Sequence, residues 1–88
     1  MKPREGIVAQ QMGEDYILVP LGEAAQDIHG LARLNESGYF IWKALCEGLD
    51  VEQIAQRLTG EYAGVDLPRA REEVGKLVAR LQEAKLVV

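Results

Sequence analysis

The 88-residue sequence is poor in the side chains on which most metal and redox sites depend. Its only cysteine is Cys46 and its only histidine is His29, so neither an internal disulfide nor a cysteine–histidine metal cluster can form. Apolar residues surround Cys46 at helical spacing, and we expect a buried or half-buried, unreactive thiol. A lone strand histidine is more often a surface residue than a metal ligand or pH sensor, and this is our interpretation of His29.

Catalytic motifs are also missing. The glycine-rich signatures of dinucleotide-binding and phosphate-binding loops do not occur, and Ser37 has no evident general base. The acidic residues are scattered, as on a solvated surface. Because a small domain without a metal, a cofactor motif or a paired acid and base has little to react with, we expect a protein that is not an enzyme and needs no cofactor.

No apolar run approaches the ~20 residues that a membrane-spanning helix requires. The opening letters MKPREG lead into a mixed stretch without the apolar core of a secretory signal, so we expect a cytoplasmic protein that does not enter membranes. The net charge of −4 disfavours general nucleic-acid binding, which depends on neutralising many phosphates. The length allows one domain, residues 1–88.

Three runs in the first 34 residues have strand character. Residues 6–12 and 15–21 flank the letters GED, which favour a tight turn. The second run is apolar on both parities, which is typical of the middle strand of a small sheet. After a loop at 22–26, residues 27–34 return as a third strand. Together the runs predict a three-stranded antiparallel meander.

Three helices follow. Asn35 and Asp50 are the expected N-caps of the first two, Asp50 with Gln53 as a variant capping box, and Gly48 closes the first helix. The third helix begins at Asp66, has a proline in its first turn and runs to about residue 84. We expect the apolar tail LVV to dock on the core. The fold class is therefore α+β, a three-stranded antiparallel sheet followed by three helices.

The third strand and the third helix carry the candidate binding residues. The strand is last in the meander and contains neither proline nor lysine, the residues that usually protect a free edge. On the helix, Arg69, Lys76 and Arg80 project in nearly the same direction beside the apolar arc. A solvated face with ion pairs such as Glu72–Lys76 explains these charges equally well. An open edge beside such a helix is the geometry that captures an extended peptide.

Three segments resemble the PqqD-like family: LNESGYFIWKAL (residues 34–45), the upstream VPLG, and DVEQIAQRLTGEYAGVD downstream. The resemblance spans nearly the whole chain. It implies a winged-helix-like peptide-recognition domain that holds the leader segment of a ribosomally synthesised precursor peptide. The leader would pair with the third strand, pack along the third helix and be presented to a radical S-adenosylmethionine enzyme. This chain departs from the family at Lys85, where a glycine is usual.

We therefore predict a non-catalytic peptide-binding protein. Its binding residues are predicted to be Ile28, His29, Gly30, Leu31, Ala32, Arg33, Leu34, Val74, Lys76, Leu77, Val78, Arg80 and Leu81. The alternatives are a DNA-binding winged helix and a structural domain that only stabilises an enzyme partner. The free edge also permits a homodimer, which would compete with the peptide.

Overall fold

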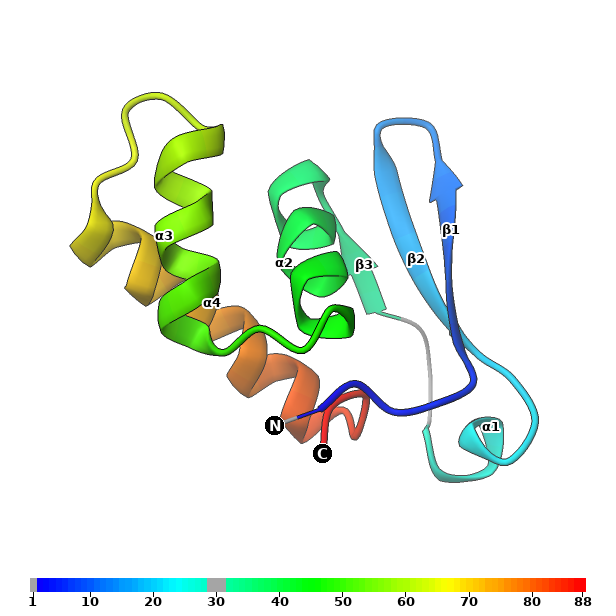
Figure 1. Cartoon of the computed structure of the whole chain (residues 1–88). Coiled ribbons are helices and arrows are strands. Elements are labelled where there is room, and N and C mark those ends of the chain that lie inside the picture. The colour runs from blue at the N-terminus through cyan, green and yellow to red at the C-terminus, as the bar shows by residue number, and fades with distance from the viewer. Residues whose placement is uncertain (1, 29–31) are drawn as a thin grey trace.

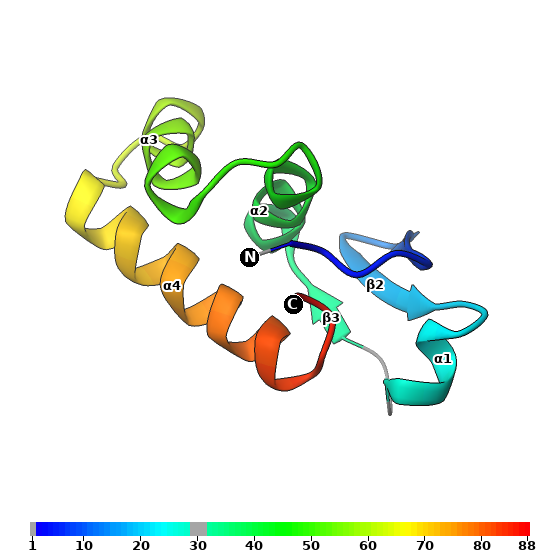
Figure 2. The same cartoon turned by 60° about the horizontal axis from the view of Figure 1, so that its bottom comes forward.

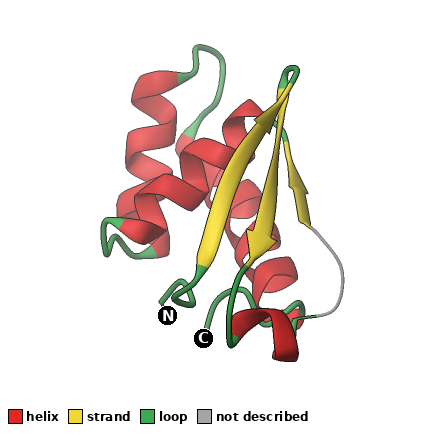
Figure 3. Cartoon of the chain, turned by 90° about the vertical axis from the view of Figure 1, so that its right-hand side faces the viewer, coloured by secondary structure: helices red, strands yellow, loops and turns green. Residues whose placement is uncertain are grey.

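The computed structural model describes residues 2–28 and 32–88 and confirms the α+β fold. An antiparallel sheet forms one layer, and the three longer helices lie on one side of it (Figures 1 and 3). In chain order the elements are β1 (Ile7–Met12), β2 (Asp15–Pro20), α1 (Ala24–Asp27), β3 (Ala32–Leu34), α2 (Glu36–Cys46), α3 (Val51–Glu61) and α4 (Leu67–Glu83).

The strand order is β1-β2-β3, so the predicted middle strand is indeed the middle one. Leu18 of β2 pairs with Ala9 on one side and Ala32 on the other, and its side chain is fully buried. Because side chains alternate along a strand, these three residues share the face that packs on the helices. Val8 and Arg33 are exposed on the opposite face.

The predicted third strand is wrong at its beginning. Residues 24–27, expected in a loop and at the strand's start, form the one-turn helix α1, and Ile28 is its C-cap residue. The Ile28 side chain is 5% exposed and belongs to the core. Within the described residues the strand consists of Ala32–Leu34 alone. The predicted strand residues His29, Gly30 and Leu31 lie outside the part of the chain that the structure describes.

The predicted helix starts are confirmed, because the predicted side chains cap them. The Asn35 side chain accepts a hydrogen bond from the backbone N–H of Gly38 at 2.8 Å. Asp50 and Gln53 form the full capping box of α3. Asp66 accepts from the third backbone N–H of α4 at 3.0 Å. Each cap satisfies a donor that has no partner within the helix, which is worth ~1 kcal/mol.

The C-terminal tail docks on the core as predicted. Leu86 and Val87 are 1% and 2% exposed. The two chain ends lie side by side (Figures 1 and 2), where Lys2 and Val88 exchange two backbone hydrogen bonds of 2.7 and 2.8 Å. Packing of the tail therefore joins α4 to the N-terminal segment.

Cys46 at the end of α2 is exposed, so the expectation of a buried or half-buried thiol is wrong. Partial burial still raises the pKa of the Cys46 thiol above its ordinary value. No helix in the described part of the chain is both long enough and apolar enough to span a membrane.

Candidate functional site

The free edge of the sheet is β3. Within residues 2–28 and 32–88, β2 is the one strand that pairs with β3, so the opposite edge of β3 has no strand partner. The C-terminal half of α4 runs close to this edge (Figure 2). Between them lies an open cavity of about 320 Å³, the edge groove, lined by Arg33 and Leu34 of β3 and by Leu77 and Arg80 of α4, among others.

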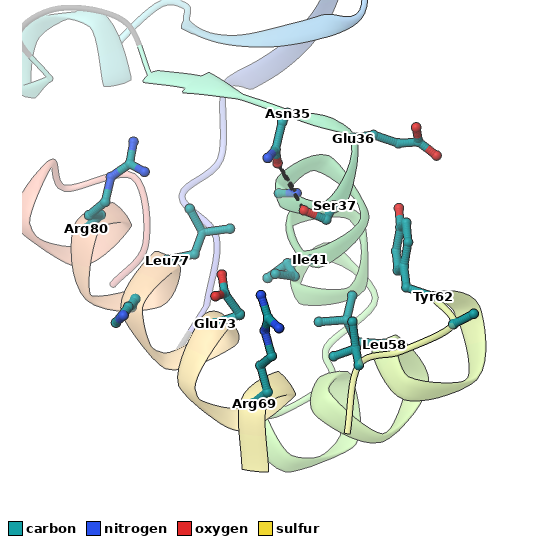
Figure 4. Close-up of a pocket in the computed structure, with 14 residues that line it drawn as sticks. Asn35, Glu36, Ser37, Ile41, Leu58, Tyr62, Arg69, Glu73, Leu77 and Arg80 are labelled. Atoms are coloured by element: carbon teal, nitrogen blue, oxygen red, sulfur yellow. Dashed lines mark hydrogen bonds between the residues drawn. The ribbon is translucent and has the colours of Figure 1, made fainter. Parts of the chain in front are cut away.

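A larger depression continues from the edge groove. This helical cleft has a volume of about 710 Å³ and lies between the N-terminus of α2, the α3–α4 connection and the exposed flank of α4 (Figure 4). Asn35, Gly38, Leu77 and Arg80 line both cavities, so the two form one continuous surface. The volume of the helical cleft alone lies within the ~300–1,000 Å³ range of ligand pockets.

The helical cleft has an apolar floor. Ile41 of α2, Leu58 of α3 and Leu77 of α4 are 3%, 3% and 8% exposed, and each presents some surface to the cavity. Tyr62 stands at the rim near Glu36 (Figure 4). Burial raises the pKa of the Tyr62 phenol, with the Glu36 carboxylate as a second cause, so the hydroxyl stays protonated at neutral pH. The floor therefore suits a large apolar side chain.

The cations of the protein differ in whether a carboxylate already neutralises them. Four of the six arginines form ion pairs: Arg4 with Asp27, Arg33 with Asp15 at 2.8 Å, Arg57 with Glu47 at 3.2 Å and Arg71 with Glu52 at 2.7 Å. Lys76 pairs with Glu72 at 2.9 Å, as one interpretation of the sequence predicted.

Arg69 and Arg80 are the other two arginines. In the described residues neither guanidinium has a hydrogen bond or an ion pair, although Arg69 contributes weakly, after Lys76, to lowering the pKa of Glu72. Both line the helical cleft. The cleft therefore contains two cations that are available to an anionic partner.

The structure divides the predicted binding residues into groups. Arg33, Leu34, Lys76, Leu77 and Arg80 line one or both cavities, and Ala32 belongs to β3. A further four are packed in the core and offer almost no surface: Ile28, Val74, Val78 and Leu81, at 5%, 0%, 5% and 2% exposure. We correct the candidate site by leaving these four out, because a ligand would have to displace core packing to reach them.

Several lining residues were absent from the predicted site. Arg69 had a sequence signal, since it projects with Lys76 and Arg80 on the same helix. Ile41, Leu58 and Tyr62 had none, because their contribution depends on how α2 and α3 pack beside α4. Within the described residues, no three histidine, cysteine, aspartate or glutamate side chains gather in a way that could hold a metal ion.

Comparisons with known proteins agree with this architecture. Two solved structures resemble the whole chain: TbiB1 in complex with the TbiA(beta) leader peptide, and lasso peptide synthetase B1 complexed with the leader peptide. Each has a TM-score of 0.78 at 24% sequence identity, covering 99% of this chain and 94% or 95% of the other. At this identity the likeness establishes the fold.

At the sequence level, no curated protein matches the chain. The family model described as Coenzyme PQQ synthesis protein D (PqqD) matches residues 15–87. That range runs from β2 through the C-terminal tail and contains all the residues that line the two cavities. The chain therefore belongs to the PqqD family.

Proposed function

We propose that this protein binds the leader segment of a ribosomally synthesised precursor peptide and presents it to a modifying enzyme, without catalysing a reaction itself. The leader adds a strand to the free edge of β3 and continues along α4. One edge of β3 pairs with no strand in residues 2–28 and 32–88 and lies beside a continuous cavity, and this observation carries the proposal. Membership of the PqqD family and two similar structures that contain leader peptides support it.

Backbone pairing alone is too weak for this function. β3 has three residues, so an added strand gains only a few hydrogen bonds, each worth about 1 kcal/mol net. Micromolar binding requires about 8 kcal/mol. Burying a large apolar side chain of the peptide contributes ~1.5–3 kcal/mol, and the floor at Leu77 provides such contacts. The cavities are therefore as necessary to the proposal as the edge.

The family resemblance implies a radical S-adenosylmethionine enzyme as the partner. We propose that such an enzyme modifies the peptide that this protein presents. The test uses a fluorescently labelled precursor peptide whose gene lies next to the gene of this protein. The peptide is titrated first with this protein and then with the enzyme encoded nearby. Deleting the leader should abolish binding to this protein. Enzyme that binds this protein equally well without leader would favour the structural-partner alternative.

Hydrogen exchange gives the sharpest test of strand addition, because the sheet has two edges. Addition of the precursor peptide should slow exchange of backbone amides in Ala32–Leu34, while the outer edge of Ile7–Met12 serves as an internal control. Protection at β1, or unchanged exchange at β3 under saturating peptide, would rule out this mode of binding. Dimers formed through β3 should dissociate when peptide is added, which sedimentation measures.

A DNA-binding winged helix requires a cationic surface that contacts phosphates. This protein has a net charge of −4, and most of its arginines are already paired with carboxylates. Salt-sensitive binding of duplex DNA at low micromolar protein would be the result that supports this alternative.

A further inference from the structure

We propose that the helical cleft selects an acidic peptide of defined pattern: two carboxylate side chains, about five residues apart, with a large apolar residue between them. This inference rests on the proposed function and adds the class of peptide that the site accepts. Arg80 and Arg69 each bind one carboxylate, and the apolar floor binds the residue between them.

The spacing follows from the geometry of α4. Arg69 and Arg80 are 11 positions apart, which is roughly 20° more than three turns at 100° per residue, so both lie on the same flank. At 1.5 Å per residue their Cα atoms are about 16 Å apart along the axis. Their side chains project side by side from α4 and not toward each other (Figure 4), so each arginine meets a different carboxylate. An extended peptide rises about 3.3 Å per residue, so about five residues separate the two contacts.

The charges between Arg69 and Arg80 disfavour an acidic residue at the centre of the bound peptide. Lys76 lies between the two arginines but is paired with Glu72 at 2.9 Å. Glu73 lines the middle of the cleft and Glu36 lies at its rim (Figure 4). These carboxylates repel an acidic residue at the centre. Attraction is therefore strongest at the two ends of the cleft, next to Arg69 and Arg80.

The apolar floor determines what lies between the acids. Ile41, Leu58 and Leu77 come from three different helices and converge below the midpoint of the cleft (Figure 4). A polar residue placed here would lose its hydration without gaining a partner, whereas a leucine, phenylalanine or tyrosine would be dehydrated favourably. The predicted pattern is thus acidic, then apolar, then acidic.

The position of Arg80 connects this pattern to the added strand. Arg80 lines both the edge groove and the helical cleft, whereas Arg69 lines only the cleft. The acidic residue that contacts Arg80 is therefore the one next to the strand-paired segment, and the acid that contacts Arg69 is farther from it. In a bound peptide, the position of these two acids relative to the strand-paired segment therefore indicates the direction in which the peptide runs.

The test is selection from a displayed library of random 16-residue peptides against the wild-type protein. We expect enrichment of Asp or Glu at two positions four to six apart, with a large apolar residue between them. Selection against Arg69→Glu should convert the distal acidic preference to Lys or Arg and leave the proximal one unchanged. Arg80→Glu should convert the proximal preference instead, and Arg80→Gln, which is milder for the end of α4, should abolish it.

Arg57→Glu is the matched control, because Arg57 is also exposed and helical but pairs with Glu47 away from both cavities. It should leave the preferences unchanged. Arg69 and Arg80 are exposed, so their variants should fold and melt like the wild type. In fluorescence anisotropy, changing one selected acid to Gln should weaken binding roughly 2–5-fold, as for the loss of an exposed ion pair. Combining an Arg→Glu variant of the protein with a peptide that has Lys or Arg at the contacting position should restore most of the affinity.

The possible failures are distinct. Enriched peptides without a paired acidic preference, or preferences unaffected by both charge reversals, overturn the inference and leave peptide binding intact. If no peptide is enriched and the precursor peptide also leaves β3 exchange unchanged, the proposed function fails and this inference fails with it.

Discussion

Replacing Lys85 with glycine should make the protein more stable. Lys85 follows the C-cap of α4 and has a φ of 64°, the one positive φ among the described non-glycine residues. Its backbone N–H bonds to the carbonyl of Gln82 at 3.0 Å, and that of Leu86 bonds to Leu81 at 2.9 Å. This hydrogen-bond pattern is the helix ending in which glycine is preferred at the position of Lys85.

The size of the gain follows from two opposing terms. Left-handed backbone costs an L-residue about 1–2 kcal/mol, which glycine avoids. Glycine also increases the conformational entropy of the unfolded chain, which returns about 0.4–1 kcal/mol. No ion pair of Lys85 occurs in the described residues, so loss of its side chain adds little. The net gain is about 0.5–1 kcal/mol, which raises Tm by about 2–8 °C in a domain of this size.

Thermal and urea unfolding followed by circular dichroism measure this difference. Lys43→Gly is the matched control, because Lys43 is an exposed lysine inside α2, where glycine costs about 1 kcal/mol relative to a good helix former. The two substitutions should therefore change Tm in opposite directions. A Lys85→Gly protein that melts below the wild type would refute the assignment of strain to this position.

Four further outcomes are expected. Gly75→Ala in α4 should add up to about 1 kcal/mol of stability in urea unfolding, because nothing lies within 4 Å of the new Cβ. Gly38→Ala should instead lower stability, since its Cβ would lie 3.2 Å from a cap oxygen, and a stabilised variant would contradict this. The Arg71 hydrogen bond lowers the pKa of Glu52 below its ordinary value of 4.5. The stabilisation that depends on the charged carboxylate is therefore present above that pH and is lost on acidification. Glu52→Gln should make the urea midpoint of unfolding depend less on pH in the acidic range. Iodoacetamide should alkylate Cys46 in the folded protein at pH 7.4 but more slowly than free cysteine, because its pKa is raised; an equal rate would disprove this.

Sequence periodicity and capping residues predicted most of the fold because these signals are local. Asn35, Asp50 and Asp66 each use their own side chain to satisfy a backbone donor three residues ahead, so the helix starts can be read directly from the sequence. The start of the third strand was mispredicted for a tertiary reason. Ala24 and Ile28 are buried in the core, and this burial stabilises a one-turn helix that has no independent stability.

The candidate site was less predictable because it depends on which charges are already neutralised. A helical wheel places Lys76 and Arg80 on one flank, but it cannot show that Lys76 is paired whereas Arg80 has no ion pair within the described residues. Arg71 is paired through packing of α3 against α4, a contact between residues 19 positions apart. The sequence therefore predicted a strand edge and a helix that lie beside the same cavities, and the structure was needed to identify the available cations.

The LNESG segment (residues 34–38) explains how the edge and the cleft are held together. Leu34 ends β3 as a buried residue, and Asn35 immediately caps α2 through the Gly38 N–H. A side chain at position 38 would press on both, because a Cβ there would lie 3.3 Å from the Leu34 Cβ and 3.2 Å from the Asn35 Oδ1. The absence of a side chain thus lets the strand end and the helix start approach closely. Since Asn35 and Gly38 also line both cavities, the same contact that fixes the fold forms the junction through which an added strand would continue into the helical cleft.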